Sequence, residues 1–189
     1  MKVHRSKLSI LSILFVLAGC ASVPYEANYP MTDEVVKSLN EDVQIKVPKG
    51  WFATTDESNA PNLLVWLVRE DYGATMAISE IKADAGTRKQ LERRGLEALA
   101  EVSFALKSER AKGKAEMVAK PREFKIDDRK FCSYEYSTDK RKTIVRVVVF
   151  NTGKHFYDFA VVPSEKEIAK VDPKSLFIIQ QSVVNSMQW

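Results

Sequence analysis

The sequence predicts an α+β fold in which an antiparallel β-sheet is packed by a long central helix and a C-terminal helix. Three observations lead to this prediction. Apolar residues alternate as in strands between residues 43 and 82, recur with a helical period between 87 and 106, and then form four strand-like runs before a second helical repeat. Because the strands are grouped on either side of one helix, they are expected to pair antiparallel.

The first part of the expected domain contains a short helix and the first strands. Residues 32–39 are expected to form the helix. Val43, Ile45 and Val47 then alternate as in a strand that ends at the turn Pro48-Lys49-Gly50, before Trp51. After a polar loop at 54–62, the apolar-rich segments 62–70 and 74–82 flank Asp71-Tyr72-Gly73, which predicts a β-hairpin.

The central helix has the clearest pattern in the chain. Thr87 followed by Gln90 fits a capping box at its start. Its apolar stripe consists of Leu91, Gly95, Ala98, Leu99, Val102 and Leu106, and its charged residues are expected to face solvent. A glycine inside a helix costs about 1 kcal/mol relative to alanine, so Gly95 indicates a close approach of the helix to the sheet.

The second half of the domain is expected to add four strands and the final helix. A charge-rich connection at 107–120 leads to strand-like segments at 123–126, 130–138, 143–152 and 155–162. Ser164 and Glu167 fit a second capping box, and Asp172-Pro173 fits the start of a helix that runs nearly to Trp189. The buried stripe of this helix is predicted to be Leu176, Ile179, Val183 and Met187.

This element order, together with Val47-Pro48-Lys49-Gly50-Trp51 and the closing Ser182-Val183-Val184-Asn185-Ser186-Met187, resembles the PsbP-like fold that DcrB-like bacterial lipoproteins share. The resemblance covers residues 40–189. It implies a PsbP-like sandwich used in the cell envelope for assembly or binding. It carries over no catalytic residues.

The N-terminal segment has the pattern of a signal peptide. Lys2, Arg5 and Lys7 precede an apolar run from Leu8 to Leu17, which is about half the roughly 20 residues that a membrane-spanning helix needs. Residues 1–19 are therefore predicted to be a signal peptide. Residues 20–31 carry two prolines and no period, so they are expected to form a flexible tether with a reach of at most about 35 Å. Residues 32–189 are predicted to form a single α+β domain.

The signal segment ends in Leu17-Ala18-Gly19-Cys20, which resembles the bacterial lipobox. This resemblance implies that Cys20 receives a diacylglycerol thioether, that the chain is cut before it, and that the membrane is a partner through this anchor. Two or three acyl chains hold a protein stably on a membrane. Ala21 stands where lipoproteins retained in the inner membrane usually have Asp, so the outer membrane facing the periplasm is the expected location in a bacterium with two membranes.

Cleavage at Cys20 changes the charge of the chain. It removes three of the 29 basic side chains and none of the 25 acidic ones, which lowers the formal balance from +4 to +1. A near-neutral chain with interspersed charges lacks the concentrated basic face that nucleic-acid binding needs. Nucleic acid is therefore excluded as an expected partner.

Few residues could support catalysis or hold a metal. After cleavage His155 is the only histidine, and Cys132 is the only cysteine not assigned to lipid, so no intramolecular disulfide can form. The acidic pairs Glu41-Asp42, Asp56-Glu57 and Asp127-Asp128 lack the spacing of a calcium loop, and the mature glycines are isolated, so no metal and no cofactor is expected. The aromatic residues are expected to be core residues or cross-strand pairs, although they could line an apolar groove: Trp51, Trp66, Tyr72, Tyr134, Tyr136, Phe156, Tyr157 and Phe159.

The sequence thus predicts a lipid-anchored envelope protein that acts as a non-catalytic binding or assembly module for an envelope protein partner. Two alternatives stay open. One is an envelope hydrolase that uses Cys132 or a serine with His155. The other is a carrier of a small apolar ligand, which requires a cavity.

Overall fold

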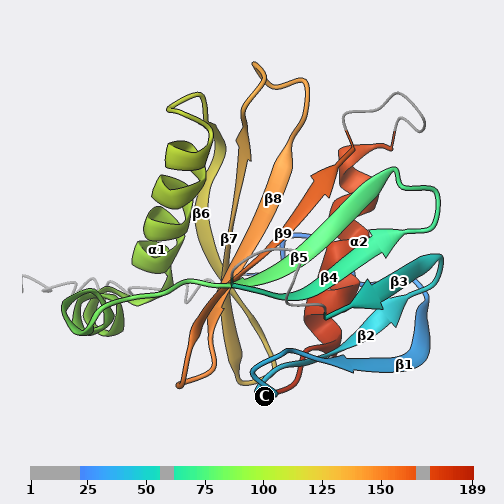
Figure 1. The fold of residues 1–189 in the computed structure, drawn as a ribbon, viewed down its shortest axis with the longest axis horizontal. Helices are drawn as coiled ribbons and strands as arrows, with labels where there is room; N and C mark the ends of the chain where they lie inside the picture. The colour runs from blue at the N-terminus through green and yellow to red at the C-terminus, as the bar shows by residue number, and fades with distance from the viewer. Residues whose placement is uncertain (1–21, 56–61, 165–170) are drawn as a thin grey trace, which may run out of the picture.

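A computed structural model describes residues 22–55, 62–164 and 171–189. Its main feature is a seven-stranded antiparallel sheet in the order β3-β4-β5-β9-β8-β7-β6, accompanied by a two-stranded sheet of β1 and β2 (Figure 1). The strands are β1 Met31–Lys37, β2 Gln44–Pro48, β3 Trp51–Thr54, β4 Leu63–Arg69, β5 Ala74–Glu80, β6 Glu116–Ile126, β7 Arg129–Ser137, β8 Val145–Asn151 and β9 Phe156–Pro163. The helices are α1 Ala85–Arg110 and α2 Pro173–Ser186.

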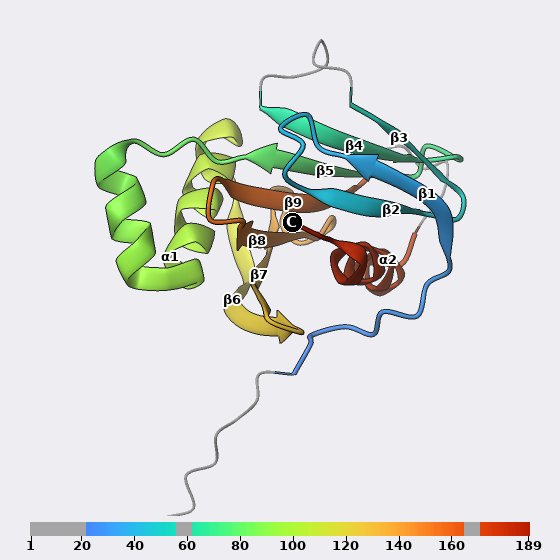
Figure 2. The same ribbon diagram turned by 90° about the horizontal axis from the view of Figure 1, so that it is seen from below.

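The two helices lie on opposite faces of the large sheet, as Figure 2 shows. Side chains alternate between these faces along each strand. In β8, Val147 belongs to the core under α1 and Val148 to the core under α2. The α2 core also contains residues of β2, such as Ile45 and Val47, so the small sheet covers part of the same face. The prediction of an antiparallel sheet packed by a central and a C-terminal helix is confirmed.

Several local predictions agree with the structure. The hairpin of β4 and β5 closes at a turn in which Asp71 accepts a hydrogen bond from the Gly73 backbone at 2.9 Å. Asp172 caps α2 by accepting from the Ser175 backbone at 3.2 Å, with a proline in the first turn. All four residues of the predicted α2 stripe are buried: Leu176, Ile179, Val183 and Met187.

The predicted short helix at 32–39 is wrong, because residues 31–37 form strand β1. This strand pairs antiparallel with β2, and Val36 lies opposite Ile45. The hydroxyl of Thr32 donates to the Val47 carbonyl at 2.9 Å. The pairing satisfies backbone groups that a helix would have satisfied internally, so tertiary contact overrides the weak local preference.

The boundaries of α1 and β6 also differ from the prediction. The cap of α1 is Asp84, which accepts from the Thr87 backbone at 2.7 Å, so the capping box from Thr87 to Gln90 is wrong. The expected connection at 107–120 is mostly structured, since α1 continues to Arg110 and β6 begins at Glu116. Register shifts interrupt the pairing of β6 with β7. At each shift the side chains stop alternating between the two faces, so apolar and polar residues do not alternate along β6 in the sequence. Of the second predicted capping box, Glu167 lies outside the described residues.

Gly95 interrupts α1. Its φ of 76° and ψ of −165° are non-helical and lie in a region that only glycine populates freely. Figure 1 shows that α1 changes direction along its length. The predicted stripe is therefore only partly correct: Leu91, Ala98 and Leu99 are buried, whereas Leu106 is exposed. Gly95 is required by the backbone conformation, and the Glu123 carboxylate would lie 3.5 Å from an added Cβ.

The segment before β1 is not a free tether from Ser22 onward. The Tyr25 hydroxyl donates to Glu135 at 2.7 Å, and the Tyr29 backbone donates to the Ser182 hydroxyl at 3.1 Å. In Figure 2 this segment runs past α2 to β1. We call residues 22–30 the N-terminal strap. The reach expected of a flexible tether does not apply to the strap, because aromatic packing and hydrogen bonds hold it on the domain.

Tyr25 covers a buried guanidinium. Arg146 of β8 has no solvent exposure, and its guanidinium lies 4.9 Å from the Tyr25 ring centroid. Arg146 donates to the side-chain oxygens of Gln180 at 3.0 Å and Gln181 at 2.7 Å, both on α2. Tyr25 also packs edge-on against Phe177, with ring centroids 5.3 Å apart. The strap, the sheet and α2 therefore meet at Arg146.

Replacing Gly95 with alanine should lower the free energy of unfolding by about 1–3 kcal/mol, because an L-residue is strained at these angles. Chemical denaturation followed by circular dichroism measures the change. In an uninterrupted helix the same substitution would raise stability by about 1 kcal/mol. A gain in stability would therefore contradict the break at Gly95.

Replacing Tyr25 with alanine should cost about 2–3 kcal/mol, since it removes aromatic packing and uncovers Arg146. Limited proteolysis should then cut the strap faster than in the unaltered protein. Tyr72 is 68% exposed and provides the matched control, for which we expect a change within about 0.5 kcal/mol. Equal effects of the two substitutions would show that the strap does not support the core.

Candidate functional site

The structure does not bring Cys132 and His155 together. Cys132 lies in β7 opposite Val149 of β8, which in turn lies opposite Asp158 of β9. His155 precedes β9, three residues before Asp158. Standard strand spacings place the two residues about 10 Å apart across the sheet and about 10 Å along it. The geometry gives no support to a Cys132–His155 nucleophile.

Each of the two residues has a structural environment of its own. Cys132 has no solvent exposure, and burial, together with the charges of Glu123 and Glu97, raises the pKa of its thiol to about 12. His155 contacts Glu80, with 3.0 Å between its Nδ1 and the carboxylate. Its ring also lies 6.0 Å from that of Tyr157. The environment of Cys132 is therefore not that of an activated nucleophile, whereas the carboxylate of Glu80 orients the His155 ring.

The acidic pairs serve turns and hydrogen bonds. Asp42 accepts from the Tyr157 hydroxyl at 2.7 Å and from the Thr152 hydroxyl at 3.0 Å. Asp127 accepts from Arg129 at 3.0 Å across the turn between β6 and β7. Asp56 and Glu57 lie outside the described residues. Within the described part of the chain, no three His, Cys, Asp or Glu side chains are grouped as metal ligands.

Most of the aromatic residues singled out by the sequence belong to the core. Those that are buried are Trp51, Tyr134, Tyr136, Phe156, Tyr157 and Phe159. Tyr72 is exposed, and its ring meets that of Phe52 edge-on at 6.2 Å. Phe52 was not predicted as a surface residue. Its exposure could have been predicted from its position next to the buried Trp51, because neighbouring strand residues point to opposite faces of the sheet.

Phe52 belongs to a row of side chains on the α1 side of the sheet, in a part of that face that no described helix covers. The pairing registers place Phe52, Val68, Thr75 and Val162 side by side across β3, β4, β5 and β9. The adjacent row, which consists of Thr54, Trp66, Ala77 and Ala160, continues under α1 to Val147 and Tyr134. We call the part of this face formed by β3, β4, β5 and Val162 of β9 the open sheet face.

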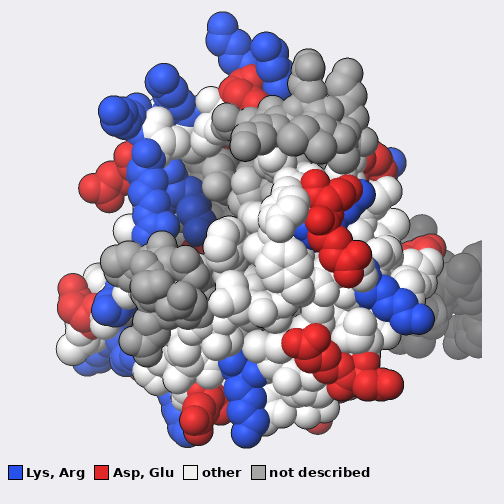
Figure 3. Space-filling view, turned by 45° about the vertical axis from the view of Figure 1, so that its right-hand side comes forward, with Lys and Arg blue, Asp and Glu red and all other residues white. Residues whose placement is uncertain are grey.

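The open sheet face is apolar in its middle. Phe52 and Val162 are 42% and 39% exposed, and Tyr72 lies beside them. Figure 3, which brings the β3 side of the molecule forward, shows a continuous area without charged side chains, with acidic side chains along one border. An exposed apolar area bordered by charged residues is a candidate site of association.

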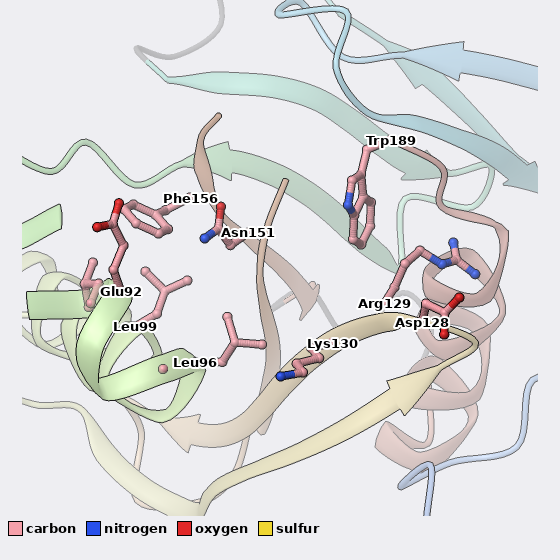
Figure 4. A pocket seen from close by; sticks show the side chains of 11 residues that line it. Glu92, Leu96, Leu99, Asp128, Arg129, Lys130, Asn151, Phe156 and Trp189 are labelled. Carbon is pink, nitrogen blue, oxygen red and sulfur yellow. The ribbon is translucent and has the colours of Figure 1, made fainter. Parts of the chain in front are cut away.

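A pocket of about 370 Å³ lies between α1 and the end of the sheet (Figure 4). Its apolar walls are Leu91, Leu96, Leu99, Phe156 and Trp189, and its polar lining is Glu92, Asp128, Arg129, Lys130 and Asn151. Trp189 was not predicted as a site residue. Its ring stacks on Phe150 at 5.3 Å, yet it remains 41% exposed.

Among the described residues, neither helix has the length and the apolar composition that crossing a membrane requires.

The thiol of Cys132 should react with iodoacetamide at pH 8 at least about 100-fold more slowly than an exposed cysteine, because a pKa of about 12 leaves little thiolate. The Cys20→Ser chain isolates this thiol, since the sequence has two cysteines. Unfolding in urea should restore labelling. A Cys20→Ser, Lys154→Cys chain supplies an exposed thiol as the control. Labelling of native Cys132 at the rate of that thiol would contradict its burial.

No family model matches the chain, and no curated protein matches it in sequence. The solved structures that share its fold include the following two. The solution structure of cyanobacterial PsbP (CyanoP) from Synechocystis sp. PCC 6803 has a TM-score of 0.55 and 16% identity, over 82% of this chain and 91% of that one. The Ran-binding protein Mog1p of Saccharomyces cerevisiae has a TM-score of 0.52 and 13% identity, over 84% and 95%. The chain has the PsbP-like α+β fold.

Proposed function

We propose that this chain is an envelope lipoprotein, anchored by lipid on Cys20, that acts as a non-catalytic binding or assembly module for a protein partner. The observation that carries the proposal is the placement of two features at opposite edges of the large sheet. The strap begins near β6, where Arg122 donates to the Ser22 hydroxyl at 3.2 Å. The open sheet face lies at β3, the other edge strand.

This placement separates the anchor from the binding surface. Seven strands with a spacing of about 4.8 Å put the two edges about 30 Å apart. A chain anchored two residues before Ser22 holds the β6 edge toward the membrane and the β3 edge toward the aqueous compartment. The open sheet face would then be accessible to a protein and not to the lipid that anchors the chain. The residue after Cys20 is Ala21, which favours the outer membrane, with the domain in the periplasm.

Two further points support a binding role. Mog1p, which has a similar fold, is a Ran-binding protein, so the same architecture is used elsewhere to bind a protein. The separation of Cys132 from His155 argues against the cysteine form of the hydrolase alternative, while the form that uses a serine with His155 stays open. The other alternative, a carrier of a small ligand, requires a cavity, and the pocket beside α1 provides one of about 370 Å³.

The anchor is tested by replacing Cys20 with serine, which removes the thiol that accepts the diacylglycerol. The variant should accumulate as an uncut precursor, because processing follows lipid transfer to the cysteine. Gel mobility and metabolic labelling with a fatty acid measure both events. Normal processing and unchanged membrane fractionation of the variant would overturn the anchor.

The binding surface is tested by a photo-crosslinking amino acid at position 52 in cells. We expect a discrete adduct at position 52 and none at position 106, since Leu106 is a similarly exposed apolar residue on α1. Val162→Asp should abolish the adduct by placing a charge on the same row, whereas Leu106→Asp should leave it unchanged. Equal adducts at both positions, or an adduct insensitive to Val162→Asp, would contradict the proposal.

A further inference from the structure

A second surface, separate from the open sheet face, has the construction of a ligand site. It is the pocket between α1, β7 and Trp189, and its volume of about 370 Å³ falls within the range of small-molecule pockets. Three leucines of α1 form one wall, while Phe156 and Trp189 complete the apolar lining. The pocket therefore offers apolar contact on more than one side.

The backbone at this pocket is held in an unusual conformation. Gly95 lines the pocket, and its φ of 76° and ψ of −165° belong to a region that only glycine adopts at low cost. The break places Leu91 on the first segment of α1 and Leu96 and Leu99 on the second, and all three contribute to the wall. The glycine thus permits the break that brings both segments of α1 to the same pocket.

Of the charged residues that line the pocket, only Arg129 forms an ion pair among the described residues. Arg129 pairs with Asp127 at 3.0 Å and lies 5.7 Å over the Trp189 ring. Glu92 lies one helical turn after Arg88, whose guanidinium is 5.0 Å from the Phe156 ring. Asp128 is exposed in the turn before Arg129. Glu92, Asp128 and Lys130 belong to none of the ion pairs found among the described residues, so the lining has an unpaired carboxylate beside Phe156 and an unpaired ammonium near Leu96.

Lys130 is also directed into the site. Figure 4 shows its ammonium group turned toward Leu96, while Glu92 lies beside Phe156 and Arg129 extends away from the α1 side of the pocket. An ammonium group at the edge of an apolar wall can pair with the charged group of an anion whose apolar body contacts that wall. The Asn151 side chain, which lines the same pocket, adds a polar group near this wall.

We infer that this pocket binds a small amphipathic anion, with a flat apolar body between the leucines and Trp189 and a carboxylate at Lys130. This binding is distinct from the protein binding proposed for the open sheet face. It depends neither on the anchor nor on a protein partner, so it can fail or succeed separately from them.

The test uses the full chain, labelled with ¹⁵N in detergent micelles, with 2-naphthoate and its neutral analogue 2-naphthamide as probes. The chain has three tryptophans, so three indole N–H signals are expected, and Trp189→Phe assigns the one at the pocket. We expect 2-naphthoate to shift the Trp189 signal saturably while that of the buried Trp51 stays fixed. Because the readout is local to Trp189, partition of the probe into micelles does not imitate it.

Two pairs of variants decide the outcome. Lys130→Met should weaken binding of 2-naphthoate about 10-fold and leave 2-naphthamide unchanged. Lys125→Met is its control, since Lys125 lies opposite Lys130 on β6 and does not line the pocket. Leu96→Phe should fill the pocket and weaken both probes, whereas Leu106→Phe on the same helix should weaken neither.

Lys130 is exposed, so its replacement keeps the test valid even where Leu96→Phe disturbs folding. The inference is overturned by a Trp189 signal that does not respond to 2-naphthoate. It is overturned equally by shifts of all three indole signals together, or by equal effects of Lys130→Met and Lys125→Met.

Discussion

The burial of Arg146 is the constraint on which the arrangement of the domain depends. A guanidinium without solvent exposure is costly unless its donors find acceptors, and here they come from Gln180, Gln181 and the Phe177 carbonyl of α2. Burial lowers the pKa of Arg146 to about 10, while the charge of Glu135 acts in the opposite direction. The Nε atom has no hydrogen-bond partner. Helix α2 and the strap are thus held on the sheet in the positions from which they contact the buried guanidinium of Arg146.

The sequence predicted the architecture well where a single period describes a segment. The α2 stripe and the β4–β5 hairpin are examples, because each buries one regular set of side chains. The predictions from the sequence were wrong where contacts between residues far apart in the chain determine the local structure. Strand β1 depends on pairing with β2, and the bulged edge strand β6 has no steady alternation. Arg146 interrupts an apolar strand, so its burial follows only from the glutamines of a helix about 35 residues later.

The candidate sites were harder to predict than the fold. Cys132 and His155 drew attention as reactive residue types, yet type alone does not bring two side chains together. Phe52, Trp189 and Lys130 are ordinary residues whose roles come from position. Phe52 is exposed because α1 packs mainly on β6, β7 and β8. Trp189 and Lys130 line the same pocket although they lie far apart in the sequence, so only the folded chain shows that they belong to one site.

The N-terminal strap also has a mechanical consequence. With the anchor at Cys20, a pull between the membrane and a partner on the open sheet face would load the strap first. The load would pass through Tyr25 and its contacts with Glu135, Arg146 and Phe177 into β7, β8 and α2, and then across the hydrogen-bonded strands to β3. The hydrogen bond from Arg122 to Ser22 would be loaded first, and the contacts of the Tyr25 ring would then pass the tension into the core of the domain.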